Sequence, residues 1–249
     1  MRRFLSLAVP LLLVVAAGSG LYAEDAAAAG APAAAPAPHQ LSLLDLVIAG
    51  GPIEFLLLLL SLICYSLALQ WTFTLKRDTF IPPGMADDVH NCFTEGVTDE
   101  AVENARNVVG SDASMLANVL AAAFDKRDFG YDAMKEAAEA IGVSEHNRYM
   151  GKVSWLSMFA SSATLMGLLG TVSGIIRSFL TMASNPGGAD PSKLAESIGE
   201  ALVCTATGLA IAIGGLYFFF FLRGRVNQAA IDVGVIANEV LDYFRPQNH

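Results

Sequence analysis

Apolar residues gather in three long tracts that are separated by segments of ordinary polarity. The tracts lie within residues 43–76, 153–183 and 198–222. Each can form a helix that crosses a hydrocarbon layer of about 30 Å, because an α-helix rises about 1.5 Å per residue. The pattern therefore predicts an all-α, polytopic membrane protein with three transmembrane helices. The first tract is rich in leucine and lacks a small-residue stripe, so we expect it to face lipid.

A shorter apolar run, Phe4 to Ala17, follows two arginines at the start of the chain and is succeeded by small residues. This order is typical of a secretory signal peptide. We expect a cleaved signal peptide over residues 1–23 and an Ala/Pro-rich periplasmic linker over residues 24–42. An uncleaved anchor helix is the alternative, but the run is short for a transmembrane span.

Two polar segments, residues 77–152 and 223–249, carry apolar residues at helical spacing. In the first segment these positions include Met115, Leu116, Val119, Leu120, Ala123 and Phe124. In the second, alternating steps of four and three residues join Val226, Ala230, Val233, Ala237, Val240 and Phe244. We expect a helical domain over residues 77–152, a C-terminal helix over residues 223–249, and a loop over residues 184–197 between the second and third spans.

Basic residues predict the orientation in the membrane. Eight of them lie between the first and second spans: Lys76, Arg77, Arg106, Lys126, Arg127, Lys135, Arg148 and Lys152. The next connection contains only Lys193, and three basic residues follow the third span: Arg223, Arg225 and Arg245. By the positive-inside rule, the helical domain and the C-terminus are cytoplasmic. The N-terminus and the 184–197 loop are then periplasmic, and the chain is expected in a bacterial inner membrane.

The composition agrees with a membrane protein and narrows its chemistry. Hydrophobic residues make up 54% of the chain and charged residues 16%, whereas about a quarter of a soluble domain is charged. Cys64, Cys92 and Cys204 lack the spacing of a metal site and are interpreted as small buried residues, so no cofactor or metal is expected. No P-loop, Rossmann glycine pattern, nucleophile elbow or His/Glu metal motif is present, which argues against an enzyme. Basic clusters with interleaved aromatics are also missing, which excludes nucleic acid as a partner.

Small residues line one face of each of the last two spans. The second span has Ala160, Thr164, Gly167, Thr171, Gly174 and Ser178 at alternating steps of four and three residues. The third has Ala201, Thr205, Gly208, Ala212 and Gly215. Such faces let helices approach closely, and Gly170 and Gly174 form a GxxxG pair. We expect Gly167, Gly170, Gly174 and Gly208 to be helix-packing positions between subunits, while each threonine hydroxyl either bonds its own helix or lines a wet path.

Glu200 is interpreted as the one acid well placed to enter a span. Intramembrane acids usually face a bundle interior or a water-filled cavity, because a carboxylate in hydrocarbon is costly. The alternative is a position at the outer interface, favoured by the positive end of its own helix. At about 100° per residue, Glu200 lies about 140° around the helix from Thr205, so the two do not share one narrow stripe.

Two motifs in the last two spans carry a resemblance to a known family. The segment Gly167–Gly174, which reads GLLGTVSG, resembles the GLLGTVxGI motif of the MotA/TolQ/ExbB proton-channel family. Downstream, Glu200-Ala201-Leu202, Thr205 and Gly208-Leu209-Ala210 look like the EAL–T–GL motif of that family. The resemblance covers about residues 50–225 and is closest to the ExbB/TolQ type.

The resemblance implies a homo-oligomer, a pentamer in that family, around single-span partners of the ExbD/TolR type that carry a membrane aspartate. It also implies proton flow past that aspartate, with a TonB-like periplasm-spanning protein as a further partner. Carried over by position, Thr171, Glu200 and Thr205 would be polar residues of the ion pathway. Thr164 and Gly214 stand where the family has prolines, which implies straighter spans.

Two alternative functions remain open at this point: a non-conducting membrane scaffold and a stator-type motor subunit. The small-residue faces alone are compatible with the scaffold, since they need only assemble a complex. Stators of that branch carry a fourth span and no cleaved signal, which disfavours the motor. The sequence does not distinguish H⁺ from Na⁺, nor the process that is driven.

Overall fold

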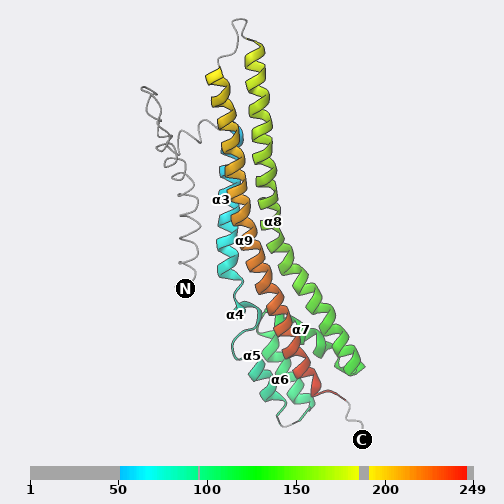
Figure 1. Ribbon diagram of the computed structural model, residues 1–249. Helices are drawn as coiled ribbons and strands as arrows, with labels where there is room; N and C mark the ends of the chain where they lie inside the picture. Colours follow the sequence, from blue (N-terminus) through cyan, green and yellow to red (C-terminus); the bar gives the residue numbers. More distant parts are fainter. Residues whose placement is uncertain (1–50, 95, 185–190, 246–249) are drawn as a thin grey trace, which may run out of the picture. The chain divides into compact units, whose positions relative to one another are not determined.

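The computed structural model describes residues 51–94, 96–184 and 191–245 of the chain. The expected signal peptide and periplasmic linker lie outside the described residues, as do residues 185–190 of the expected 184–197 loop. Residues 191–197 of that expected loop are helical and form the start of α9. All regular structure in the described part is helical (Figure 1): α3 (Gly51–Thr74), α4 (Arg77–Phe80), α5 (Met85–Cys92), α6 (Asp99–Gly110), α7 (Met115–Asp125), the 3₁₀ turn η2 (Arg127–Phe129), α8 (Tyr131–Ala183) and α9 (Pro191–Asp242). The predicted all-α class is confirmed.

Within the described residues, three helices are long and apolar enough to cross a membrane, as the hydrophobic pattern predicts. They are the segments Ile53–Thr74, Tyr131–Ala183 and Ser197–Asp242. The last two are much longer than a span, because α8 has 53 residues and α9 has 52. At about 1.5 Å per residue each extends about 80 Å, more than twice the hydrocarbon thickness.

The expected borders between the last two spans and the polar segments are not helix ends. Both α8 and α9 continue through them without a break, and also through Thr164 and Gly214, in agreement with the straighter spans that the resemblance implies. No proline interrupts either helix interior, and a Cβ added at Gly151 or Gly224 would meet nothing within 4 Å. A lone exposed helical glycine costs only about 1 kcal/mol, so these glycines do not end the helices.

The chain divides into two compact units. Of the described residues, unit 1 comprises those up to Leu62 together with those of Phe159–Gly214, and unit 2 comprises those of Ile63–Met158 together with those from Gly215 onward. In unit 1, a small apolar cluster joins the three long helices through Leu57, Ala163 and Ile211.

Unit 2 has an extensive apolar core formed by α4–α7 and by parts of the long helices. Two of its helices begin with side-chain caps: the Thr98 hydroxyl accepts from the Ala101 N–H, and the Ser114 hydroxyl accepts from the Ala117 N–H. Gly130 adopts a φ of 94°, which favours glycine, where η2 gives way to α8.

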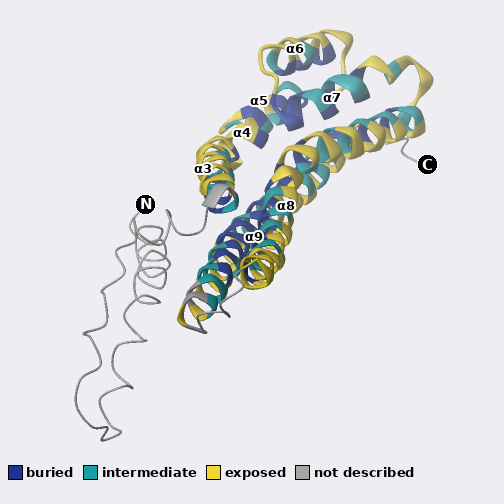
Figure 2. Ribbon diagram, turned by 90° about the horizontal axis from the view of Figure 1, so that it is seen from above, coloured by how far each residue is buried: buried dark blue, intermediate teal, exposed yellow. Residues whose placement is uncertain are grey.

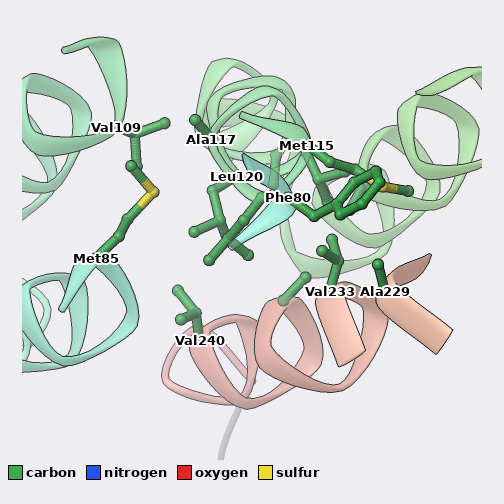
Figure 3. Close-up of a cluster of buried hydrophobic side chains, with 14 of the residues drawn as sticks. Phe80, Met85, Val109, Met115, Ala117, Leu120, Ala229, Val233 and Val240 are labelled. Atoms are coloured by element: carbon green, nitrogen blue, oxygen red, sulfur yellow. The ribbon is translucent and has the colours of Figure 1, made fainter. Parts of the chain in front are cut away.

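The core of unit 2 includes the C-terminal stripe that the sequence predicts. Val226, Val233 and Val240 of α9 are at most 1% exposed, and the side chains of Val233 and Val240 lie opposite Phe80 and Leu120 (Figure 3). The Phe93 ring packs at a tilt against Phe124 and edge-on against Phe244, at ring-centroid distances of 6.1 and 5.3 Å. The helices bury one face and expose the other (Figure 2), as amphipathic spacing requires.

The expectation that α3 faces lipid holds for only part of its surface. One side of the helix is buried, through Glu54, Leu57, Cys64 and Ala68, whereas neighbours such as Leu62 are exposed. The side chains on the buried side follow steps of three, seven and four residues, which keeps them on one helical face. The leucine-rich composition did not predict this buried face, because large apolar residues are equally suited to contact with lipid and with protein.

Candidate functional site

The closest helix approach in unit 1 is the seam between α8 and α9, and two glycines touch backbone there. A Cβ added at Gly208 would lie 2.7 Å from the Ala163 carbonyl oxygen, and one at Gly167 would lie 3.1 Å from the Cys204 carbonyl oxygen. Ordinary carbon contacts are longer than about 3.4 Å, so any larger residue would force the helices apart.

Two further glycines continue the same seam along α8. A Cβ at Gly170 would lie 2.7 Å from the Cβ of Cys204, and one at Gly174 would lie 2.5 Å from the Cβ of Ala201. The structure thus brings all four sequence-predicted glycines to this seam. The contacts are made within one chain, whereas the sequence analysis expected contacts between subunits.

A hydrogen bond of the candidate pathway residue Thr205 crosses this seam. The Thr205 hydroxyl donates to the carbonyl oxygen of Gly167 on the facing helix, at 2.9 Å. The bond forms where the missing glycine side chain lets the two backbones meet. Thr205 is therefore held in one orientation and fixes the rotation of α9 against α8.

Thr171 uses its hydroxyl differently. The side chain is half-buried, and its oxygen donates to the carbonyl of Leu168 in its own helix at 2.7 Å. Of the two alternatives for a span threonine, the structure thus shows the local one here. Thr164 and Ser178 also bond carbonyls of α8, at 3.4 and 2.9 Å.

Glu200, the third pathway candidate, is half-buried on α9 and lies one helical turn before Cys204. The two side chains share a face of α9, because residues four apart in a helix lie one above the other. Cys204 in turn packs on Gly170 of the seam. Glu200 therefore lies beside the tightest packing of unit 1.

The sequence analysis missed a second acid in this region. Glu54 of α3 is 3% exposed, and its carboxylate is a hydrogen-bond partner of the Cys204 thiol. Its second oxygen, Oε2, has no hydrogen-bond partner among the described residues. The interpretation of Glu200 as the one acid placed to enter a span is therefore wrong. The available signal was the spacing of Glu54 with Leu57, Ser61, Cys64 and Ala68, at steps of three and four residues.

The described residues contain no group of three or more His, Cys, Asp or Glu side chains that could hold a metal ion. The polar groups around Cys204 are instead its own thiol, two carboxyls and, on the next residue, the Thr205 hydroxyl, which bonds Gly167. Carboxyls can bind and release protons, whereas a hydroxyl can only donate or accept a hydrogen bond at ordinary pH. Chemically, the arrangement is suited to handling protons.

Comparison with known proteins assigns the chain to a family. Residues 111–233 match the model of the MotA/TolQ/ExbB proton channel family. The ExbB-like 1 biopolymer transport protein of Synechocystis sp. is 32% identical over 219 residues, which cover 85% of this chain and 84% of the relative. An ExbB homolog of Methanothermobacter thermautotrophicus is 26% identical over 188 residues, 75% of this chain and 65% of the relative. The biopolymer transport protein ExbB of Xanthomonas campestris is 32% identical over 101 residues, 40% of this chain and 39% of the relative. The chain belongs to the MotA/TolQ/ExbB proton channel family.

Proposed function

We propose that this protein is the proton-channel subunit of an inner-membrane energy-transducing complex of the ExbB–ExbD or TolQ–TolR kind. The complex would couple the proton motive force to transport or to other work at the cell envelope. Family membership supports this role, and so do relatives named as biopolymer transport proteins. The single observation that carries the proposal is a half-buried acid, Glu200, beside the closely packed seam of α8 and α9.

The proposed assembly is a homo-oligomer, a pentamer by family resemblance, around single-span partners of the ExbD/TolR type. A TonB-like periplasm-spanning protein is a further proposed partner. The outer faces of the helices in unit 1 support a membrane setting with neighbours, because large apolar side chains remain uncovered there. Among them Leu165, Leu168 and Leu169 of α8 are 56–67% exposed. Surfaces of this kind require lipid or another apolar helix.

In this proposal Glu200 takes up and releases the proton, while Thr171 and Thr205 act through hydrogen bonds. The hydrogen bond from Thr205 to Gly167 supports a positioning role, since it fixes the face of α9 that carries Glu200. The proposed orientation has the N-terminus in the periplasm and the C-terminus in the cytoplasm. It rests on the basic residues of the 77–152 segment.

The test is proton uptake into vesicles that contain the chain co-purified with a single-span partner of the ExbD/TolR type. Glu200→Ala should abolish uptake, because no other group at that position can carry the proton. Thr205→Val should lower uptake at least about tenfold, since the loss of a buried hydrogen bond costs about 1 kcal/mol and misplaces α9. Thr207→Val is the matched control on the same helix and should leave uptake unchanged. Uptake at the wild-type rate in Glu200→Ala and Thr205→Val together would refute the pathway.

The second candidate function is a non-conducting membrane scaffold. One observation favours it: the glycines and Thr205 are fully accounted for by packing and hydrogen bonding between α8 and α9. A scaffold would assemble normally and retain its role in the cell when Glu200 is replaced by alanine. The vesicle assay separates the two functions, because only a channel loses flux in that variant.

A further inference from the structure

Glu54 is the most deeply buried charged side chain in the described part of the protein, at 3% exposure. It lies where the three helices of unit 1 meet. A Cβ added at Gly170 of α8 would lie 3.3 Å from the Cys204 sulfur and 3.6 Å from a methyl of Ile53, the residue before Glu54. Gly170 thus lies where Cys204 of α9 meets the start of α3, and the Glu54 carboxyl is a hydrogen-bond partner of the Cys204 thiol.

Within the described residues, no positively charged group forms an ion pair with Glu54. From α9, the Cys204 thiol bonds its carboxyl, and Glu200 lies one helical turn before Cys204. From α8, Gly170 borders Cys204 and Ile53 and contributes no side chain. The Oε2 atom of Glu54 accepts no hydrogen bond within the described part of the chain. An uncompensated carboxylate in such a place is strongly unfavourable unless it binds a cation or a proton.

We propose that Glu54 is a second proton-binding carboxyl of the membrane unit, which exchanges its proton with Glu200. This inference rests on the proposed function. It adds a residue of α3 to the proposed proton pathway, whose other residues belong to α8 and α9. In the exchange, a proton leaves the carboxyl of one glutamate and is taken up by the carboxylate of the other. The net charge of the pair is unchanged, which matters in a low-dielectric setting. The Cys204 thiol between them can both donate and accept a hydrogen bond.

The competing explanation is that Glu54 is a structural acid. It stands in the first turn of α3, where the positive end of the helix favours a carboxylate. A structural acid would stay ionised across the working pH range and would not respond to Glu200. A proton-binding acid would gain and lose its proton, and its titration would depend on the charge of Glu200.

Infrared spectroscopy of the full-length chain in lipid vesicles separates these explanations without the partner. We expect a protonated-carboxyl signal that disappears in Glu54→Gln. The signal should persist in Glu103→Gln, a matched control at an exposed acid of α6. In Glu200→Gln the pH midpoint of the signal should move by at least about one pH unit.

Three infrared outcomes would overturn the proposal. The first is an identical spectrum for wild type and Glu54→Gln. The second is a pH midpoint that is unchanged in Glu200→Gln. The third is loss of the signal when Na⁺ is added, which would indicate a sodium site. Glu54→Asp keeps a carboxyl and covers the case in which Glu54→Gln fails to fold. It should retain the signal with a changed midpoint, and a variant that folds without the signal would count against the proposal.

Proton uptake by the complex with its partner completes the test. Glu54→Gln should lower the rate at least about tenfold, and Glu54→Asp should recover part of it. Wild-type uptake in Glu54→Gln would overturn the exchange while leaving the proposed function intact. Absence of uptake in the wild-type complex would instead refute the proposed function, and the infrared result would still decide whether Glu54 binds a proton.

Discussion

Replacing Gly208 by alanine is expected to destabilise the membrane unit, although alanine is the better helix former. The added Cβ would lie 2.7 Å from the carbonyl oxygen of Ala163 and 3.0 Å from the Cα of Gly167. Both are backbone atoms, so neither can rotate away as a side chain would. The helices must therefore separate by roughly 0.5–0.7 Å to restore ordinary contact distances.

Two opposing effects determine the size of the change. Alanine favours the helix over glycine by about 1 kcal/mol. Overpacking a well-packed contact costs about 1–3 kcal/mol. Separation of the helices also lengthens the 2.9 Å hydrogen bond from Thr205 to Gly167, whose loss costs about 1 kcal/mol more. The sum predicts a net destabilisation of about 1–3 kcal/mol.

Gly224→Ala is the matched control, because a Cβ there would meet nothing within 4 Å on the same helix. We expect it to stabilise the protein by up to about 1 kcal/mol. The measurement is unfolding of the purified chain in mixed detergent micelles, with the unfolding midpoint of each variant compared to wild type. Equal or greater stability of Gly208→Ala would refute the close approach of α8 and α9 at this position.

Three further predictions concern other parts of the chain. Thr205→Val should lower the free energy of unfolding by about 1 kcal/mol and Thr205→Ser by less, because serine can still donate to Gly167; equal losses would speak against the interhelical bond. Phe124→Ala should cost about 3–5 kcal/mol in thermal or denaturant unfolding, since the ring is fully buried in unit 2, and a loss below 1 kcal/mol would contradict that core. In a chain without its native cysteines, Ser184→Cys should react with an impermeant thiol reagent from the periplasm and Ala113→Cys should not; the reverse labelling would overturn the proposed orientation.

The three spans could be predicted from the sequence because hydrophobic length is a local property. The same holds for the stripe at Val226, Val233 and Val240, whose spacing alone identifies the buried face of a helix. The sequence did not predict that α8 and α9 each run as one unbroken helix. Hydropathy changes at residues 152 and 222, but a change of polarity does not end a helix that contains no breaker.

The site could be predicted only in part. The glycines of the seam follow from their spacing, but the sequence does not say whether their neighbours belong to the same chain or to another. The burial of Glu54 could not be predicted from the sequence, because it depends on contacts with residues about 150 positions away, such as Cys204. Composition alone assigned α3 to lipid, and only the tertiary contacts identify its buried face.

The central claim is that the chain conducts protons together with a single-span partner that carries a membrane acid. It is tested most directly by proton uptake into vesicles containing the co-purified complex under an imposed membrane potential. We predict uptake in the wild-type complex, and none from the chain alone or when the partner's membrane aspartate is replaced by asparagine. Equal uptake in all three preparations, or no uptake in any, would contradict the account.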